Sequence, residues 1–244
     1  MHQVMSLKKI IPIFCFVLVF IGCAGDKTIS QNDVIGLTAE NVPEGIRITL
    51  DHIPPETDHI AIFMTTEGRN AHGLLAEFLD WDTFPFGSSS LKELKETRTL
   101  VCPFVQNGLN YSIRAYVHIN DGSFTSYEAS AEIIPDNGIL FVPDGITMKL
   151  NETKTGAALS AFPELSYGVR YDIESKYTYL IHSEEDDFPV EGDFDDLTFD
   201  FSKSLEEFKA GSTLYNITPY RHLKYDNVTW SLNFCEPEFF NASL

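Results

Sequence analysis

An acidic run between residues 184 and 196 is the densest group of metal-ligating side chains in this 244-residue sequence. Ca²⁺ takes about six to eight oxygen ligands, and a run this dense supplies such oxygens. The run lacks the spacing of an EF-hand, however, and charge runs in proteins are usually solvated loops. The expected interpretation is therefore a solvated acidic loop with no cofactor, and calcium binding is the alternative. The candidate ligands are Asp186, Asp187, Asp193 and Asp195.

A second candidate site is aromatic. Trp81, Phe84 and Phe86 stand among carboxylates in a segment rich in loop-forming residues. An exposed ring flanked by carboxylates is a form that a sugar-stacking platform takes. A ring in such a place more often fills the edge of a β-sandwich. The segment therefore has two interpretations, and the binding one predicts a glycan ligand.

Sequence motifs for catalysis are missing. The chain has no Gly-x-Ser-x-Gly, no His-Glu-x-x-His, no phosphate-binding glycine-rich loop and no Cys-x-x-Cys. Three histidines, His52, His59 and His118, are the only set placed to converge across a sandwich, and they lack the spacing of zinc ligands. We therefore expect a protein that is not an enzyme.

The charge balance narrows the partners further. With 17 basic and 36 acidic residues, the chain has a formal net charge of −19. A surface this acidic repels phosphate backbones, so nucleic acid is not an expected partner.

The N-terminal segment has the features of a secretory signal. Lys8 and Lys9 precede an apolar run over residues 10–21, and Gly22 and Cys23 follow it. The run is shorter than the roughly 20 apolar residues of a membrane span. We expect a signal peptide over residues 1–22 and a polar tether over residues 23–31.

The end of this segment, Phe20-Ile21-Gly22-Cys23, resembles the lipobox of bacterial lipoproteins. The resemblance implies that Cys23 becomes the lipidated N-terminus. Because Ala24 and not Asp follows the cysteine, it also implies the outer membrane or cell surface of a Gram-negative bacterium. The alternative is an ordinary cleaved signal with a chance cysteine. Of the other cysteines, Cys102 and Cys235 stand in apolar strand contexts in different halves of the chain, which favours two free thiols.

A repeated stretch sets the architecture. Val42-Pro-Glu-Gly-Ile-Arg-Ile-Thr-Leu50 returns one hundred positions later as Val142-Pro-Asp-Gly-Ile-Thr-Met-Lys-Leu150. Each copy is a turn followed by alternating apolar and polar residues, which is typical of a half-buried strand. The repeat predicts two β domains, over residues 32–135 and 136–244, with a short hinge at residues 135–138.

Other patterns predict the remaining elements. The apolar run over residues 60–64 favours a central strand, and residues 111–117 favour another with Tyr111 on its buried face. The serines at 88–90 favour the cap of a short helix. Tyr215 and Tyr220 repeat the spacing of Tyr111 and Tyr116, and Trp230 falls on the apolar side of a last strand.

These residues resemble a fibronectin type III domain: the strand over 45–50, the Pro54-Pro55 pair, the strand starting at Ile60 and the Gly108-Leu-Asn-Tyr111 approach to the next strand. The resemblance implies an all-β chain of two tandem antiparallel β-sandwiches of the fibronectin type III or immunoglobulin-like kind. It also implies that the Tyr111 hydroxyl anchors a corner.

The expected function is that of a lipid-anchored envelope protein that acts as a non-catalytic binding or spacer module. Its partners would be the membrane, through the lipid, and a protein or glycan at the cell surface. Two alternatives remain at this point: a fimbrial subunit or anchor, which pairs by donated strands, and a surface glycan-binding lipoprotein.

Overall fold

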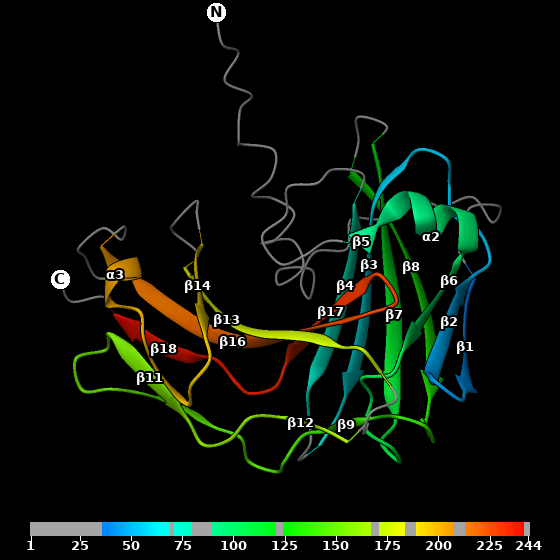
Figure 1. Ribbon diagram of the computed structural model, residues 1–244. Coiled ribbons are helices and arrows are strands. Elements are labelled where there is room, and N and C mark those ends of the chain that lie inside the picture. The colour runs from blue at the N-terminus through cyan, green and yellow to red at the C-terminus, as the bar shows by residue number, and fades with distance from the viewer. Residues whose placement is uncertain are drawn as a thin grey trace, which may run out of the picture.

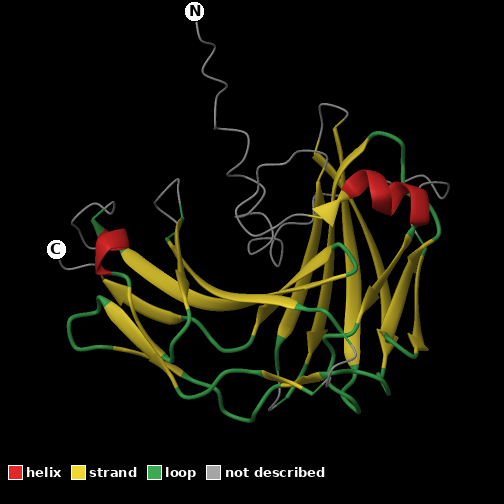
Figure 2. Cartoon of the chain, in the orientation of Figure 1, coloured by secondary structure: helices red, strands yellow, loops and turns green. Residues whose placement is uncertain are grey.

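The computed structural model describes residues 36–68, 71–79, 89–120, 124–166, 171–183, 189–206 and 213–241. This part of the chain is all-β, and its sheets are antiparallel apart from one short parallel pair (Figures 1 and 2). Neither of the two helices in these ranges is long or apolar enough to cross a membrane. The predicted fold class is therefore confirmed at the level of an all-β, sandwich-like protein.

The first half of the chain, residues 36–135, contains eight strands and one helix in the described ranges. They are β1 (Leu37–Val42), β2 (Gly45–Leu50), β3 (Thr57–Thr66), β4 (Gly73–Leu79), β5 (Ser89–Ser90), α2 (Leu91–Thr97), β6 (Thr99–Cys102), β7 (Tyr111–Asn120) and β8 (Phe124–Ile133).

The second half, residues 136–241, contains ten strands and one helix in the described ranges. They are β9 (Leu140–Phe141), β10 (Met148–Leu150), β11 (Gly156–Leu159), β12 (Glu164–Leu165), β13 (Glu174–His182), β14 (Val190–Phe194), β15 (Thr198–Asp200), α3 (Ser202–Leu205), β16 (Leu214–Tyr225), β17 (Val228–Asn233) and β18 (Glu238–Asn241).

The same strand order occurs in both halves. A small sheet has the order β1-β2-β6 in the first half and β10-β11-β15 in the second. Four further strands have the order β4-β3-β7-β8 in the first half and β14-β13-β16-β17 in the second. By this order, β1, β2, β3, β4, β6, β7 and β8 of the first half correspond to β10, β11, β13, β14, β15, β16 and β17 of the second.

Local sequence explains several of these elements. Ile46, Ile48 and Leu50 of β2 are fully buried, as their alternation predicts. Helix α2 begins after Ser90, whose hydroxyl accepts a hydrogen bond from the Glu93 amide, so the predicted serine cap is confirmed.

The buried Tyr111 has the contact that a corner tyrosine makes. Its hydroxyl accepts a hydrogen bond of 2.9 Å from the Gln106 amide, five residues upstream, and lies 2.7 Å from Nε2 of His72. These contacts tie the approach to β7 to the strand itself.

The repeated stretch, by contrast, does not occupy equivalent places. In the first half, Val42 pairs with Gly45, so the Val-Pro-Glu-Gly segment is the turn of the β1–β2 hairpin. In the second half, the corresponding segment precedes β10, which is the edge strand of its sheet, whereas β2 is the middle strand of its own. The expectation that residues 46–50 and 146–150 form equivalent strands is therefore wrong, because by strand order β10 corresponds to β1.

Both halves contribute to one ten-stranded sheet. Strand β17 of the second half pairs with β4 of the first, with Trp230 opposite Ala76 and Ser231 opposite Leu75. The Thr229 amide also donates a 3.0 Å hydrogen bond to the Ser89 hydroxyl. Figure 1 shows the result: the strands of the first half stand upright, those of the second half run across, and the small sheets lie on the outer sides of the angle.

A disulfide across this junction is a direct test of the pairing. Leu75→Cys with Ser231→Cys is expected to oxidise readily, because directly opposite residues have the Cα separation that a disulfide needs. The two native thiols in the described ranges, Cys102 and Cys235, will not compete, since both are buried and burial raises the pKa of Cys235 to about 12. The measurement is free-thiol counting after mild oxidation.

The matched control is Leu75→Cys with Lys149→Cys, because Lys149 is an exposed residue of the small sheet and pairs with β11. Equal oxidation of both pairs, or of neither, would contradict the β4–β17 register.

Candidate functional site

Many of the predicted site residues lie outside the described part of the chain. Cys23, the aromatic residues Trp81, Phe84 and Phe86, and the acidic residues Asp186 and Asp187 all belong to this group. Lipidation, the aromatic platform and these two calcium ligands therefore stay predictions.

The other two proposed calcium ligands are described. Asp193 lies on the edge strand β14 and Asp195 just after it, and both are exposed. Lys176 Nζ lies 3.6 Å from Asp193 Oδ1, an exposed ion pair of the kind that contributes little to stability. Among the described residues, no group of three or more His, Cys, Asp or Glu side chains is placed to hold a metal ion.

The histidine set is only partly brought together. His59 of β3 and His118 of β7 are cross-strand partners, whereas His52 is an exposed residue before β3. Each of the two partnered histidines has a carboxylate beside it, Glu77 for His59 and Asp58 for His118. The arrangement thus consists of two imidazole–carboxylate pairs.

These pairs lie on one face of the ten-stranded sheet, which we call the inner face. Directly paired residues of an antiparallel sheet point to the same side, so the register identifies the face strand by strand. It lines the inside of the angle in Figure 1, away from the two small sheets. Its residues include Asp193, Thr178, His222, Ser231, Leu75, Glu77, Ala61 and Tyr116.

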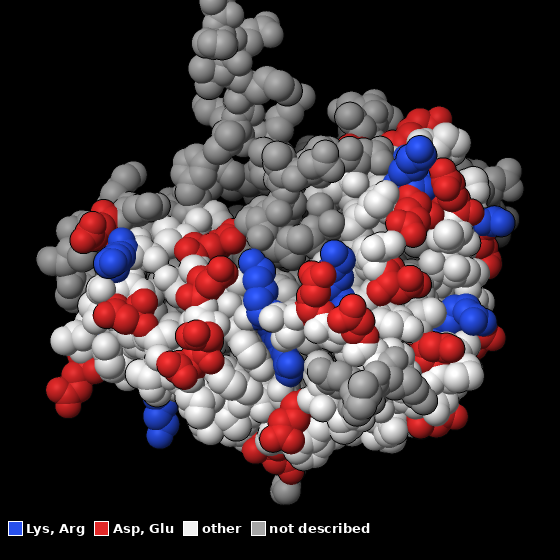
Figure 3. Space-filling model, in the orientation of Figure 1, with Lys and Arg blue, Asp and Glu red and all other residues white. Residues whose placement is uncertain are grey.

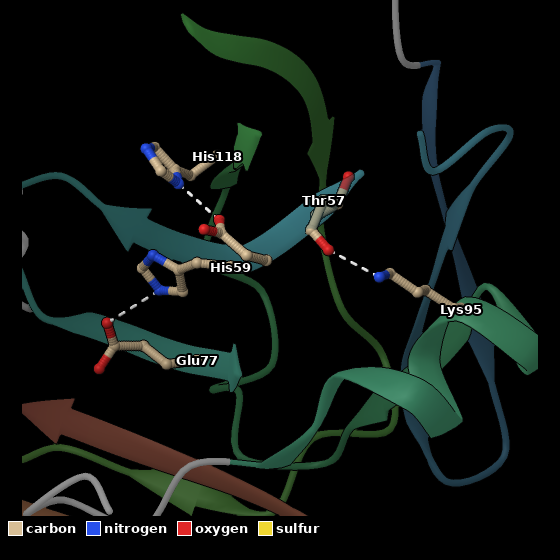
Figure 4. Close-up of polar contacts among 6 residues, drawn as sticks. Thr57, His59, Glu77, Lys95 and His118 are labelled. Atoms are coloured by element: carbon tan, nitrogen blue, oxygen red, sulfur yellow. Dashed lines mark hydrogen bonds and ion pairs between the residues drawn. The ribbon is translucent and has the colours of Figure 1, made fainter. Parts of the chain in front are cut away.

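In the first half, a β-bulge arranges the polar groups of the inner face. The register of β3 against β7 shifts between Thr57 and His59, so that Asp58 and His59 both stand opposite His118. His118 Nδ1 and Asp58 Oδ1 are 2.5 Å apart, and His59 Nε2 and Glu77 Oε1 are 3.3 Å apart (Figure 4). Bulges of this kind redirect side chains next to functional sites.

Lys95 fixes the start of β3 from the other side. Its ammonium donates a 2.6 Å hydrogen bond to the Thr57 carbonyl (Figure 4). It donates a longer one, of 3.3 Å, to the Pro55 carbonyl. Helix α2 thereby holds the strand segment that carries the bulge.

In the second half, a buried histidine is fully hydrogen-bonded. His222 Nε2 lies 2.7 Å from the Thr178 hydroxyl, and its Nδ1 lies 2.9 Å from the Ser231 hydroxyl. Burial, followed by the nearby charge of Lys176, lowers the pKa of His222 to about 4. An imidazole with so low a pKa is neutral at pH 7 and is a weak base.

Electrostatics couple the two halves across the junction. Burial, followed by the charge of Glu77 in the first half, raises the pKa of Tyr220 in the second half to about 12. The Tyr220 ring also stacks on the His222 ring, with 6.3 Å between centroids. Groups from both halves therefore share one electrostatic environment.

Two aromatic rings border the polar groups. Phe63 of β3 and Tyr116 of β7 form an edge-to-face pair with centroids 5.5 Å apart, and both are partly exposed. Tyr116 and Glu77 are the two neighbours of the small Ala61 along the same row of the sheet.

A separate polar hollow of about 320 Å³ lies at the linker between the halves, lined by residues that include Asn107, Gly138 and Tyr171. Its polar groups hold the linker in place: the Gly138 amide donates to Asn107 Oδ1, and Asn137 donates to the Val42 carbonyl. The hollow is thus a consequence of how the linker is held.

The charge of the protein is spread over its surface. Figure 3 shows acidic side chains over both halves of the visible face, with a few basic ones among them. The net charge of −19 makes the surroundings of the inner face unfavourable for an anion.

Glu191 on the edge strand β14 provides a test of the inner-face environment. Burial raises its pKa from 4.5 to about 7, against the opposing effect of Lys176. A raised pKa in the folded state means that Glu191 favours folding below pH 4.5 and that this contribution is lost as the pH rises through 7.

Glu191→Gln is therefore expected to stabilise the fold at pH 8 relative to pH 4.5, by about 1 kcal/mol after allowing for solvent screening of a partly exposed group. Urea unfolding at the two pH values measures the difference. An effect of Glu191→Gln that is the same at both pH values would contradict the raised pKa.

No model of a protein family matches the chain, and no curated protein matches its sequence. The assignment of a function therefore rests on the residues and geometry described above.

Sequence reasoning missed the main groups of the inner face, namely Glu77, Tyr116, Thr178, His222 and Ser231. The signal for Tyr116, Thr178, His222 and Ser231 is the run of polar and aromatic residues at alternate positions of β7, β13, β16 and β17, whereas Glu77 stands between two leucines on its face of β4. Such a run shows which side of a strand points away from the core, but it does not reveal which strands are neighbours.

Proposed function

We propose that the chain is a lipid-anchored envelope protein of two tandem fibronectin type III-like sandwiches, and that it works by binding through the inner face. The identical strand order in the two halves and the corner contact of Tyr111 support the tandem sandwiches. The lipobox-like sequence ending at Cys23 supports the anchor at a Gram-negative outer membrane or cell surface.

One observation carries the choice of binding over spacing, namely the β4–β17 pairing. A spacer gains reach when its domains are joined end to end. In this chain the two halves pair edge to edge, which shortens the reach. The pairing joins the faces that point away from the two small sheets into one rigid, continuous surface, the inner face. Rigid presentation of a surface lowers the entropic cost of binding.

The alternative of a fimbrial subunit has no comparable support. Pairing by donated strands needs an open strand position in the acceptor. In the described ranges, each half supplies all seven strands of the shared order from its own sequence.

The test blocks one face at a time in the full chain. Lys176→Cys places a thiol on the inner face, and Lys149→Cys places one on a small sheet; both lysines are exposed. Each variant is coupled to a bulky maleimide polymer, and retention on immobilised envelope polysaccharides and on whole bacterial cells is measured. We expect the polymer at position 176 to abolish retention and the polymer at position 149 to leave it unchanged.

Retention that survives both polymers, or no retention of the unmodified protein, would overturn the proposed binding function. Cys23→Ala tests the anchor separately, with loss of the membrane fraction and of incorporated fatty acid as the expected result.

A further inference from the structure

The most unusual feature of the inner face is a buried pair of polar side chains that are not properly hydrogen-bonded. His59 and Glu77 are 6% and 7% exposed, and their nearest atoms, Nε2 and Oε1, are 3.3 Å apart. The contact is an ion pair without hydrogen-bond alignment, and Nε2 of His59 has no hydrogen-bond partner in the described part of the chain. Buried polar groups are nearly always paired, because leaving them unpaired costs free energy.

The strand geometry maintains this arrangement. The bulge at Asp58 sets His59 beside His118, and the carboxylate of Asp58 contacts Nδ1 of His118 at 2.5 Å. Asp58 is therefore already engaged and does not satisfy His59. The imidazole of His59 and the carboxylate of Glu77 therefore lie next to each other on the inner face.

The rim around the pair is partly exposed and aromatic. Tyr116 borders Ala61 on the side away from Glu77, and Phe63 follows Ala61 on the same face of β3. His118 and Asp58 border His59. A buried imidazole nitrogen and a buried carboxylate, next to partly exposed rings, match a ligand with adjacent hydroxyl groups and an apolar ring face.

Charge decides between ligand classes. The carboxylates of Asp58 and Glu77, within a protein of net charge −19, disfavour an anionic ligand. Of two adjacent hydroxyls of a neutral sugar, one donates to Glu77 and the other accepts from His59 Nε2, so that both groups are satisfied without an added charge.

We propose that the first half of the inner face binds a neutral carbohydrate, with His59 and Glu77 holding adjacent hydroxyls and Tyr116 stacking against the sugar ring. This inference rests on the binding function proposed above. It places the carbohydrate on β3, β4 and β7.

The experiment is a glycan array carrying neutral, acidic and amino sugars, followed by calorimetry with the best neutral oligosaccharide. Glu77→Gln keeps the shape of the side chain and removes the carboxylate, and Tyr116→Ala removes the ring. Each is expected to weaken binding about tenfold or more, as the loss of a hydrogen bond to a charged group or of a stacked ring implies. Phe141→Ala, which removes an exposed aromatic on β9, is the matched control and is expected to bind like the wild type.

Thermal unfolding establishes that each variant is folded. If Tyr116→Ala fails to fold, the nearly isosteric Glu77→Gln still decides the question. Binding only to acidic or amino sugars, or neutral-sugar binding unchanged by Glu77→Gln, would overturn the inference. Loss of retention with the polymer at position 176 but no binding to any glycan would also overturn it, while leaving the binding function itself in place.

Discussion

Trp230→Ala is expected to lower the free energy of unfolding by about 4 kcal/mol, because replacing a fully buried tryptophan by alanine removes its packing and leaves a cavity. Trp230 lies on the core side of β17, opposite Leu223 of the same half and Ala76 of the other. The buried residues of both halves form one continuous cluster that contains it. The loss should therefore appear in both halves.

Two measurements check this. Urea unfolding gives the loss of free energy, and hydrogen exchange shows where protection falls. Amides of β3, which belongs to the first half, are expected to lose protection together with those of β16. If β3 retained full protection, the two halves would be independent units and the rigid inner face would be untenable.

Trp230→Phe is the matched control. The indole Nε1 has no hydrogen-bond partner in the described part of the chain, so its removal breaks no hydrogen bond. Phenylalanine also keeps most of the buried apolar area. We expect less than half of the loss seen with alanine, and an equal loss in both variants would contradict packing as its source.

Local patterns in the sequence predicted local structure well. The alternation of Ile46, Ile48 and Leu50 gave the buried side of β2, and Ser90 gave the start of α2. These features depend on residues a few positions apart, and their physical causes act over the same distance. The burial of Tyr111 and Trp230 followed from the same alternation.

Pairing between distant strands was not accessible in this way. Nothing in β4 or β17 marks Ala76 and Trp230 as neighbours, because an edge strand offers the same backbone groups to any partner. The inner face exists only through this pairing, so its composition was also out of reach. The repeated stretch at 142–150 was misleading for a related reason: a turn-and-strand signature recurs wherever a strand starts, whatever its place in the sheet.

The candidate site shows the same limit. The sequence singled out His59 and His118 by residue type, as members of a possible zinc set. The bulge that sets Asp58 beside His118 depends on the register of β3 against β7, and the place of Glu77 beside His59 depends on the pairing of β3 with β4. Neither is encoded in the spacing of the histidines.

The second large effect is a loss of folding stability at acidic pH that comes from His222. Its pKa is lowered to about 4 in the folded protein against about 6.5 in the unfolded chain, so the unfolded chain takes up the proton first. The stability that neutral His222 contributes is therefore complete above pH 6.5 and is lost as the pH falls toward 4. The full difference corresponds to about 3 kcal/mol. Lys176 and Asp193 are the charged groups that act on it from β13 and β14.

His222→Gln removes the titrating group and keeps an amide that can bond to the Thr178 hydroxyl. We expect the variant to be less stable than the wild type at pH 7.5, because the second bond, to Ser231, is lost.

Between pH 6.5 and pH 4.5, the free energy of unfolding of His222→Gln should fall less steeply than that of the wild type. Making both measurements in the Glu191→Gln background removes an opposing titration on this face, since the protonation of Glu191 stabilises the fold over the same fall in pH. Parallel curves would mean that His222 is protonated as easily in the folded protein as in the unfolded chain. The buried, hydrogen-bonded environment described for His222 would then be wrong.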